Sequence, residues 1–184
     1  MVTPAVKSLH KTQTNKGPDT MNETYERLYT EQQIAAALAT AKENYGSWGK
    51  EDHPAGTRHQ FKPGLQKYID GALGEIVFAD HVGLTPNGRD YYNIGDVGIY
   101  QVKATRCAND DINLIVPRNQ AVTFKQSPFV LIQLFDCHYK IRGWTWGHQI
   151  PVKSHWLQEN GDTSGGAYWV TTNQLQPMDD LPTV

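Results

Sequence analysis

GALGEIVFADHVGLTPNGRDYYNIGDVGIYQVKAT, residues 71–105, is the stretch of sequence that decides the fold. Its last part, residues 100–105, alternates between apolar and polar side chains, the period of two that is typical of a β-strand. Gln101 and Lys103 are two positions apart, so the pattern predicts that both point to one face of that strand. Asp96 lies just upstream, between glycines that permit a tight bend. The stretch therefore predicts an acid, an amide and a lysine gathered at the start of a strand.

The segment before this strand has the pattern of an amphipathic helix that carries Glu75. Glu75 falls at the edge of the apolar stripe, and Gly71, one turn earlier on the same side, leaves room for close approach. A carboxylate beside the core is costly unless it is paired, hydrogen-bonded or bound to a metal. The helix alone favours a rim residue whose carboxylate reaches solvent. With Asp96, Gln101 and Lys103 following, the pattern favours a divalent-metal site acting on phosphate, because hard cations prefer oxygen ligands. The stripe itself recurs at helical spacing: Leu65, Tyr68, Ile69, Ala72, Leu73, Ile76 and Val77.

The order of a glutamate on a helix, an aspartate, and then Gln-x-Lys on a strand resembles the PD-(D/E)XK nuclease superfamily. More narrowly, GALGE, GL, DVGIYQVKAT, LIVP and GWTWG follow one another as in small nuclease-like proteins of tailed-phage genomes, over roughly residues 64–181. The resemblance implies an α/β fold with a restriction-endonuclease-like core, in which helices flank a mixed central β-sheet. Two features depart from the pattern: Gln101 replaces the usual second carboxylate, and only four residues separate it from Asp96.

The resemblance also implies the roles of the site residues. Glu75, Asp96, Gln101 and Lys103 would be the catalytic set of a Mg²⁺- or Mn²⁺-dependent phosphodiesterase acting on DNA. Asp96 would be the central metal ligand, and Glu75, the Gln101 side-chain oxygen and the Val102 backbone carbonyl would complete the metal site. Lys103 would orient or deprotonate the attacking water and stabilise charge in the transition state. The alternative is a catalytically inactive nuclease-fold module that binds DNA or a protein partner, with Gln101 as a trace of lost activity.

Three arginines are candidates for contacts with substrate phosphates: Arg58, Arg106 and Arg118. Arg58 belongs to a basic, glycine- and proline-rich loop over residues 46–63, for which an ordinary solvated loop is an equal alternative. Arg106 and Arg118 flank a predicted short strand at 113–116.

Length and composition fit one domain with an extension. The 184 residues, 39% of them hydrophobic, predict a flexible extension over residues 1–20 and a single nuclease-like domain over residues 21–184. With 17 basic and 19 acidic residues the net charge is −2, which argues against a general nucleic-acid-coating protein. A nuclease with local basic residues is still allowed, because a bound metal also neutralises phosphate.

Two cysteines without a CxxC motif argue against a disulfide framework or a cysteine zinc site. The apolar runs are shorter than a signal-peptide core or a membrane span, so we expect no membrane partner. These features predict a cytoplasmic protein, in a bacterial host if it is phage-encoded. The sequence leaves open whether the chain acts alone or as a homodimer.

Periodicity predicts helices near residues 30–45 and 64–82 and strands near residues 96–105, 112–116, 128–135, 139–146 and 167–171. Residues 21–45 have a helical pattern throughout, with a Thr30–Gln33 capping box. The inward stripe of this helix is expected at Ile34, Leu38, Ala41 and Tyr45. The almost continuous apolar run at residues 129–135 predicts a central strand buried on both faces. A short helix is expected within residues 147–160.

Overall fold

The structure is a computed structural model that describes residues 25–47, 64–87, 95–157 and 166–183. The predicted extension over residues 1–20 and the loop that carries Arg58 lie outside these ranges. The elements, in chain order, are β1 (Tyr25–Leu28), α1 (Glu31–Ser47), α2 (Leu65–Val82), β2 (Gln101–Arg106), β3 (Asn113–Pro117), α3 (Arg118–Thr123), β4 (Pro128–Leu134), β5 (His138–Trp146), the 3₁₀ helix η1 (Gly147–Gln149), α4 (Ile150–Lys153), β6 (His155–Leu157), β7 (Ala167–Thr171), η2 (Thr172–Gln174) and η3 (Met178–Asp180).

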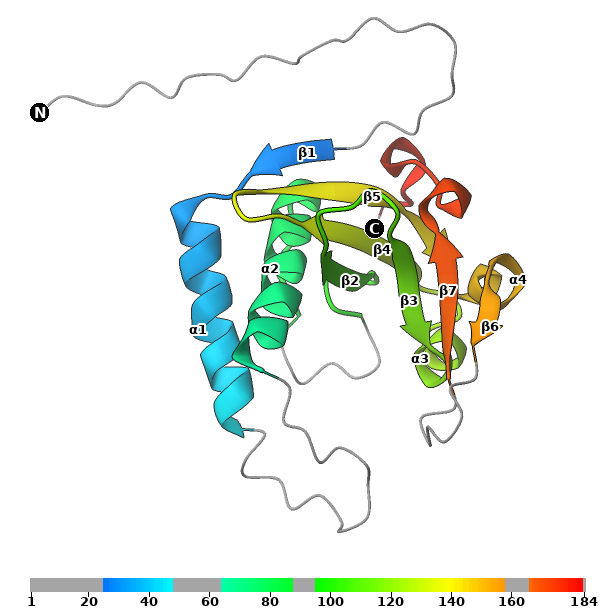
Figure 1. Cartoon of the computed structure of the whole chain (residues 1–184), viewed down its shortest axis with the longest axis horizontal. Helices are drawn as coiled ribbons and strands as arrows, with labels where there is room; N and C mark the ends of the chain where they lie inside the picture. Colours follow the sequence, from blue (N-terminus) through cyan, green and yellow to red (C-terminus); the bar gives the residue numbers. More distant parts are fainter. Residues whose placement is uncertain (1–24, 48–63, 88–94, 158–165, 184) are drawn as a thin grey trace, which may run out of the picture.

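Two sheets form the centre of the molecule. The larger sheet has the strand order β1-β5-β4-β2, in which β2 and β4 are parallel and the other pairs are antiparallel. The smaller sheet, β3-β7-β6, is antiparallel. Helices α1 and α2 lie side by side to one side of the larger sheet, and the smaller sheet lies at the opposite end of the view in Figure 1. The expectation of a mixed α/β fold, with a mixed sheet flanked by helices, is confirmed.

Strand β4 is the central strand that the apolar run predicted. All seven of its residues are buried. Alternate side chains enter two different cores, because α1 and α2 cover one face and the smaller sheet covers the other. Val130 and Ile132 belong to the core under the helices, whereas Phe129 and Leu131 belong to the core under the smaller sheet. Such two-sided burial explains why the run lacks polar alternation.

Helix α1 begins where the capping box predicted, but the face that it buries differs from the one predicted from its apolar stripe. The Gln33 N–H donates to the Thr30 hydroxyl at 3.1 Å, and the Thr30 N–H donates to the Gln33 side-chain oxygen at 2.9 Å. Ile34 and Leu38, however, are 49% and 36% exposed. The buried positions of α1 are Gln33, Ala37 and Ala41. The predicted stripe is therefore wrong at Ile34 and Leu38, whereas Ala41 is buried and Tyr45 half-buried, because the helix packs against α2 mainly through alanines.

Two other expectations need correction. Residues 25–28 form strand β1, which pairs with β5, instead of the start of a helix. Strand β2 begins at Gln101, since residues 96–100 form a turn and not the strand start expected at 96. The short helix expected within residues 147–160 is confirmed as α4, and β6 follows it. β3 and β7 were predicted as strands, but they belong to a second sheet that periodicity did not foresee.

Candidate active site

Helix α2 holds Glu75 close to strand β2 because of a glycine. A Cβ atom added at Gly74 would lie 2.5 Å from the Ala104 Cβ, so the helix reaches this distance from the strand only with glycine at position 74. Gly71, which we expected to serve close approach, would place a Cβ with no described atom within 4 Å. The close contact is therefore made at Gly74, and Gly71 faces open space.

A glycine turn positions Asp96 at the start of β2. Gly95 and Gly98 have φ values of 125° and 56°, a region that favours glycine, as the predicted tight bend requires. The side-chain amide of Asn87 donates to the carbonyls of both glycines, at 3.0 Å and 2.8 Å. Its backbone N–H donates to the Asp96 carbonyl at 2.9 Å. Asn87 is thus a positioning residue that the sequence reasoning missed, and its only sequence signal is its place in a Pro-Asn-Gly turn.

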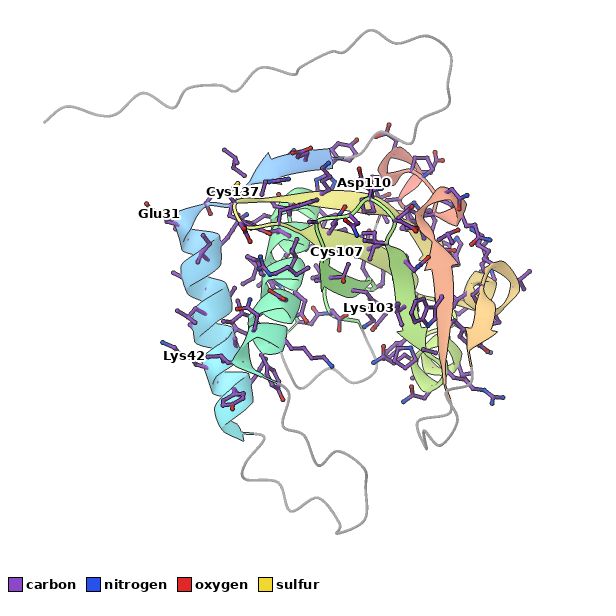
Figure 2. The ribbon with its side chains drawn as sticks, in the orientation of Figure 1. Glu31, Lys42, Lys103, Cys107, Asp110 and Cys137 are labelled. Atoms are coloured by element: carbon purple, nitrogen blue, oxygen red, sulfur yellow. The ribbon has the colours of Figure 1, made fainter. Side chains whose placement is uncertain are left out.

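The Asp96 carboxylate contacts both the backbone of β2 and Lys103. Its Oδ2 accepts a hydrogen bond of 2.7 Å from the Val102 N–H and lies 3.7 Å from the Lys103 Nζ. The Asp96 and Lys103 side chains are 29% and 23% exposed, so solvent reaches both. Lys103 projects from β2 (Figure 2), with its Nζ 6.0 Å from the centroid of the buried Phe129 ring. The aspartate and the lysine that the sequence singled out are therefore neighbours in space.

Gln101 lies on the same face of β2 as Lys103 and is almost completely buried, with 3% of its surface exposed. Among the described residues, no hydrogen bond reaches its side-chain amide. The buried polar side-chain atoms that lack a partner there are Gln120 Oε1 and Ser154 Oγ, so the Gln101 amide atoms still reach solvent. A solvated amide oxygen is a candidate ligand for a cation or a polar substrate group.

The pKa of Glu75 indicates that its carboxyl lies near Asp96 and Lys103. Burial, and after it the neighbouring Asp96 charge, raise the pKa of the Glu75 carboxyl to about 7, against the opposing effect of Lys103. The influence of both side chains shows that the two carboxylates and the lysine form one cluster. Two acids that repel each other beside the core would both be stabilised by a cation.

The Val102 carbonyl also faces this cluster. Strand β2 is the end strand of the larger sheet, with β4 as its only partner there. The Val102 N–H points away from β4, toward Asp96. Because the N–H and C=O of one residue point to the same side of a strand, the Val102 carbonyl lies on this outer edge as well. The Asp96 carboxylate and the Val102 carbonyl are thus both at the outer edge of β2.

The arginines predicted to bind substrate are in other surroundings. Arg106, at the far end of β2, donates to Asp70 of α2 at 2.8 Å and 3.1 Å and to the Phe135 carbonyl at 3.0 Å. These contacts join α2 to the turn between β4 and β5. Arg118 begins α3, where its backbone N–H donates to the Gly166 carbonyl at 3.1 Å. Arg58 lies outside the described residues. The Arg106 side chain therefore pairs with Asp70 and the Phe135 carbonyl, away from the cluster of Glu75, Asp96 and Lys103.

A pocket of about 310 Å³ opens between α1 and α2, next to this cluster. Glu75 forms part of its wall, so the pocket and the acidic cluster share a side chain. The sequence did not predict this pocket, because its walls come from two helices that are separated in the chain. Its lining residues are Asn44, Lys67, Tyr68, Gly71, Ala72 and Glu75.

Comparison of the chain with protein-family models, with curated proteins and with solved structures finds no match. Within the described ranges, no three His, Cys, Asp or Glu side chains group together as a metal-binding set. A cation at the cluster would therefore depend on two carboxylates, Glu75 and Asp96, together with neutral oxygens. None of the described helices combines the length and hydropathy needed to span a bilayer.

Proposed function

We propose that this protein is a metal-dependent nuclease that hydrolyses phosphodiester bonds of DNA. The observation that carries the proposal is the convergence of Glu75, Asp96 and Lys103 at the edge of β2, on which Gln101 lies two residues before Lys103. Paired carboxylates with a lysine are what metal-assisted phosphate chemistry requires. The proposal extends to the fold, with β2, β4, β5 and α2 as a restriction-endonuclease-like core, and to a phage-encoded protein acting in the bacterial cytoplasm.

The residues present fit a divalent cation. Glu75 and Asp96 repel each other, Gln101 offers an amide oxygen that no described hydrogen bond occupies, and the Val102 carbonyl faces the outer edge of β2. Oxygen donors of this kind suit Mg²⁺ or Mn²⁺. Such an ion supplies Lewis acidity, which polarises a phosphate oxygen and lowers the pKa of a nucleophilic water. Because Gln101 is neutral, the site should bind the cation more weakly than a site with three carboxylates would.

Within this proposal the chain's own groups have separate tasks. The Lys103 ammonium, whose Nζ lies 3.7 Å from the Asp96 carboxylate, can hold the attacking water and neutralise charge that develops on the phosphate. Glu75 would join Asp96 in holding the cation, which would offset the burial and the Asp96 charge that raise the pKa of its carboxyl in the metal-free protein. Asp96 keeps Lys103 in place and fixes the start of β2 through the Val102 N–H.

A second function has one observation in its favour. The Asp96 Oδ2 already accepts a hydrogen bond from the Val102 N–H, and the usual second carboxylate is the neutral Gln101. Both features reduce the negative charge available to a metal. A non-catalytic module that binds DNA or a protein would retain this fold without needing the cation.

Metal-dependent cleavage separates the two functions. Labelled single-stranded, double-stranded and branched DNA would be incubated with Mn²⁺ or Mg²⁺ and wild-type protein, Asp96→Asn or Asp111→Asn. Asp111 is an exposed acid of the β2–β3 connection, so its amide variant is a matched control. We expect cleavage by wild type and Asp111→Asn and its loss in Asp96→Asn. If all wild-type reactions stay blank and calorimetry detects no Mn²⁺ binding, the non-catalytic module is the better account.

A further inference from the structure

Helix α2 contains two glycines, Gly71 and Gly74, and packing explains the glycine at only one of these positions. A glycine within a helix is less favourable than alanine by about 1 kcal/mol. Contact with β2 accounts for Gly74, where a Cβ would meet the Ala104 Cβ at 2.5 Å. At Gly71 a Cβ would meet no described atom within 4 Å, so packing among the described residues does not require glycine there. Gly71 instead lines the pocket between α1 and α2.

The pocket has the side chains that recognise a nucleotide. Tyr68 offers an aromatic ring, which also packs edge-to-face against Tyr45, and the exposed Lys67 offers a cation for phosphate. Its volume of about 310 Å³ lies at the lower end of the range for small-molecule sites. Because Glu75 belongs to both the wall and the acidic cluster, an occupant would lie next to the reacting phosphate.

We propose that this α1–α2 pocket binds an unstacked nucleobase of single-stranded DNA, next to the phosphate held by Glu75, Asp96 and Lys103. A base within a duplex is stacked and paired, so it cannot enter a pocket between two helices without leaving the duplex. The proposal rests on the proposed nuclease function and specifies its substrate class: single-stranded DNA, including single-stranded segments of branched DNA. Gly71 leaves the pocket open for the base.

The test fills the pocket and measures binding separately from cleavage. Fluorescence anisotropy would follow a labelled oligothymidylate and a labelled duplex in Ca²⁺, with wild type, Gly71→Leu and Ala36→Leu. Ala36 is an exposed position of α1 that does not line the pocket, so this variant controls for the added side chain. We expect Gly71→Leu to weaken single-strand binding about tenfold or more. Ala36→Leu should leave single-strand binding unchanged, and any duplex affinity should be the same in all three proteins.

A second pair of variants keeps the test decisive if Gly71→Leu disturbs the fold. Tyr68→Ala should weaken binding of the single strand, and Tyr68→Phe, which keeps the ring, should restore it. Equal single-strand affinity in folded Gly71→Leu and wild type would overturn the pocket proposal, even if Mn²⁺-dependent cleavage is found. Pocket-dependent binding without any cleavage would retain the pocket and overturn the nuclease. The two failures are therefore distinguishable.

A separate observation concerns the outer face of α1. Glu31, Ala35, Leu38 and Lys42 follow one another at helical spacing, and both charged side chains project from the outer side of the helix (Figure 2). Leu38 is 36% exposed, and Ile34 beside it is 49% exposed. Glu31 and Lys42 are about 16 Å apart along one helix, so they cannot pair with each other within the chain. This face is apolar in the middle and oppositely charged at its ends.

The face is complementary to itself. Glu31 and Lys42 are equally far in sequence from the midpoint of the row, and so are Ala35 and Leu38. In an antiparallel pair of α1 helices, each Glu31 would face the other copy's Lys42, and each Leu38 the other copy's Ala35. We infer that the face binds a second copy of this chain in a two-fold symmetric dimer. One helix face is smaller than the ~800 Å² per partner of stable interfaces, so the dimer should be concentration-dependent.

Charge exchange tests the dimer. Light scattering after size exclusion, over a range of concentrations, would compare wild type with Glu31→Lys, Lys42→Glu and the double variant. Each single change places like charges opposite each other and should abolish the dimer, whereas the double change restores both pairs and the dimer. A wild type that stays monomeric at all concentrations, or single variants that dimerise as wild type does, would overturn the inference.

Discussion

Replacing Glu75 by glutamine should make the metal-free protein more stable at neutral pH and should remove part of its pH dependence. The pKa of Glu75 is raised in the folded protein from an ordinary value of 4.5 to about 7, first by burial and then by Asp96. Between these two pH values the folded state binds more protons than the unfolded chain. The free energy of unfolding therefore falls as pH rises through this window and is lowest above it.

The magnitude follows from the shift. A tenfold change in proton affinity corresponds to about 1.4 kcal/mol, so a rise from 4.5 to about 7 amounts to ~3 kcal/mol. The Glu75 side chain is partly exposed, and screening by solvent reduces the expected effect to about 2 kcal/mol. Glutamine has similar shape and no charge. Above pH 7, Glu75→Gln should exceed wild type by this amount in unfolding free energy, and below pH 4.5 the two should agree.

Urea unfolding in EDTA, at a series of pH values that spans the window, measures the difference between the two proteins. Glu43→Gln is the matched control, because Glu43 is an exposed glutamate of α1 outside the cluster, and its curve should run parallel to that of wild type. Added Mn²⁺ should stabilise wild type more than Glu75→Gln, since a ligand stabilises the state that binds it. A difference between wild type and Glu75→Gln that stays constant across the pH window would refute the reasoning.

Three further substitutions test the neighbours of Glu75. Asp96→Asn removes a charged ligand, so cleavage should be lost. It keeps an acceptor for the Val102 N–H, so the unfolding free energy should change by less than about 1 kcal/mol, whereas Asp96→Ala should lower it by a further ~1–3 kcal/mol in urea unfolding. Gln101→Glu should lower the Mn²⁺ midpoint for cleavage and, in EDTA, lower stability by ~1–3 kcal/mol, whereas an unchanged midpoint would remove Gln101 from the site. Gly74→Ala should lower the melting temperature, because the added Cβ would overlap Ala104 and destabilise the folded state by ~1–3 kcal/mol. A higher melting temperature would show that α2 can shift away from β2.

The parts of the fold that could be predicted are those in which the hydrophobic pattern of a single segment is enough to identify the element. The apolar run at β4 and the alternation at β2 each reflect the surroundings of that strand alone. Strand β1 carries no such signal, since its four residues are held by pairing with β5, more than a hundred positions away. The face of α1 was misread because its inward side chains are alanines, which leave little hydrophobic contrast around the helix.

The same distinction applies to the site. Asp96, Gln101 and Lys103 lie within eight residues of one another, so a strand and a bend suffice to predict their proximity. The contact between Asn87 and the glycine turn depends on side-chain hydrogen bonds that periodicity does not encode. The pairing of Arg106 with Asp70 links residues 36 positions apart, and no local pattern indicates it. Sequence reasoning therefore predicts ligands on one element better than partners across elements.

Two features that reduce stability coincide at one place in this molecule. Burial opposes the ionisation of Glu75, and position 71 of α2 is a glycine that no described contact requires. The first is unfavourable by about 2 kcal/mol and the second by about 1 kcal/mol, a sizeable part of the net stability of a small domain. Local preferences usually agree with the fold except at functional sites. A cation at the cluster would stabilise the ionised Glu75, and a base in the pocket would fill the space that Gly71 leaves open, which is the physical reason to look for both ligands here.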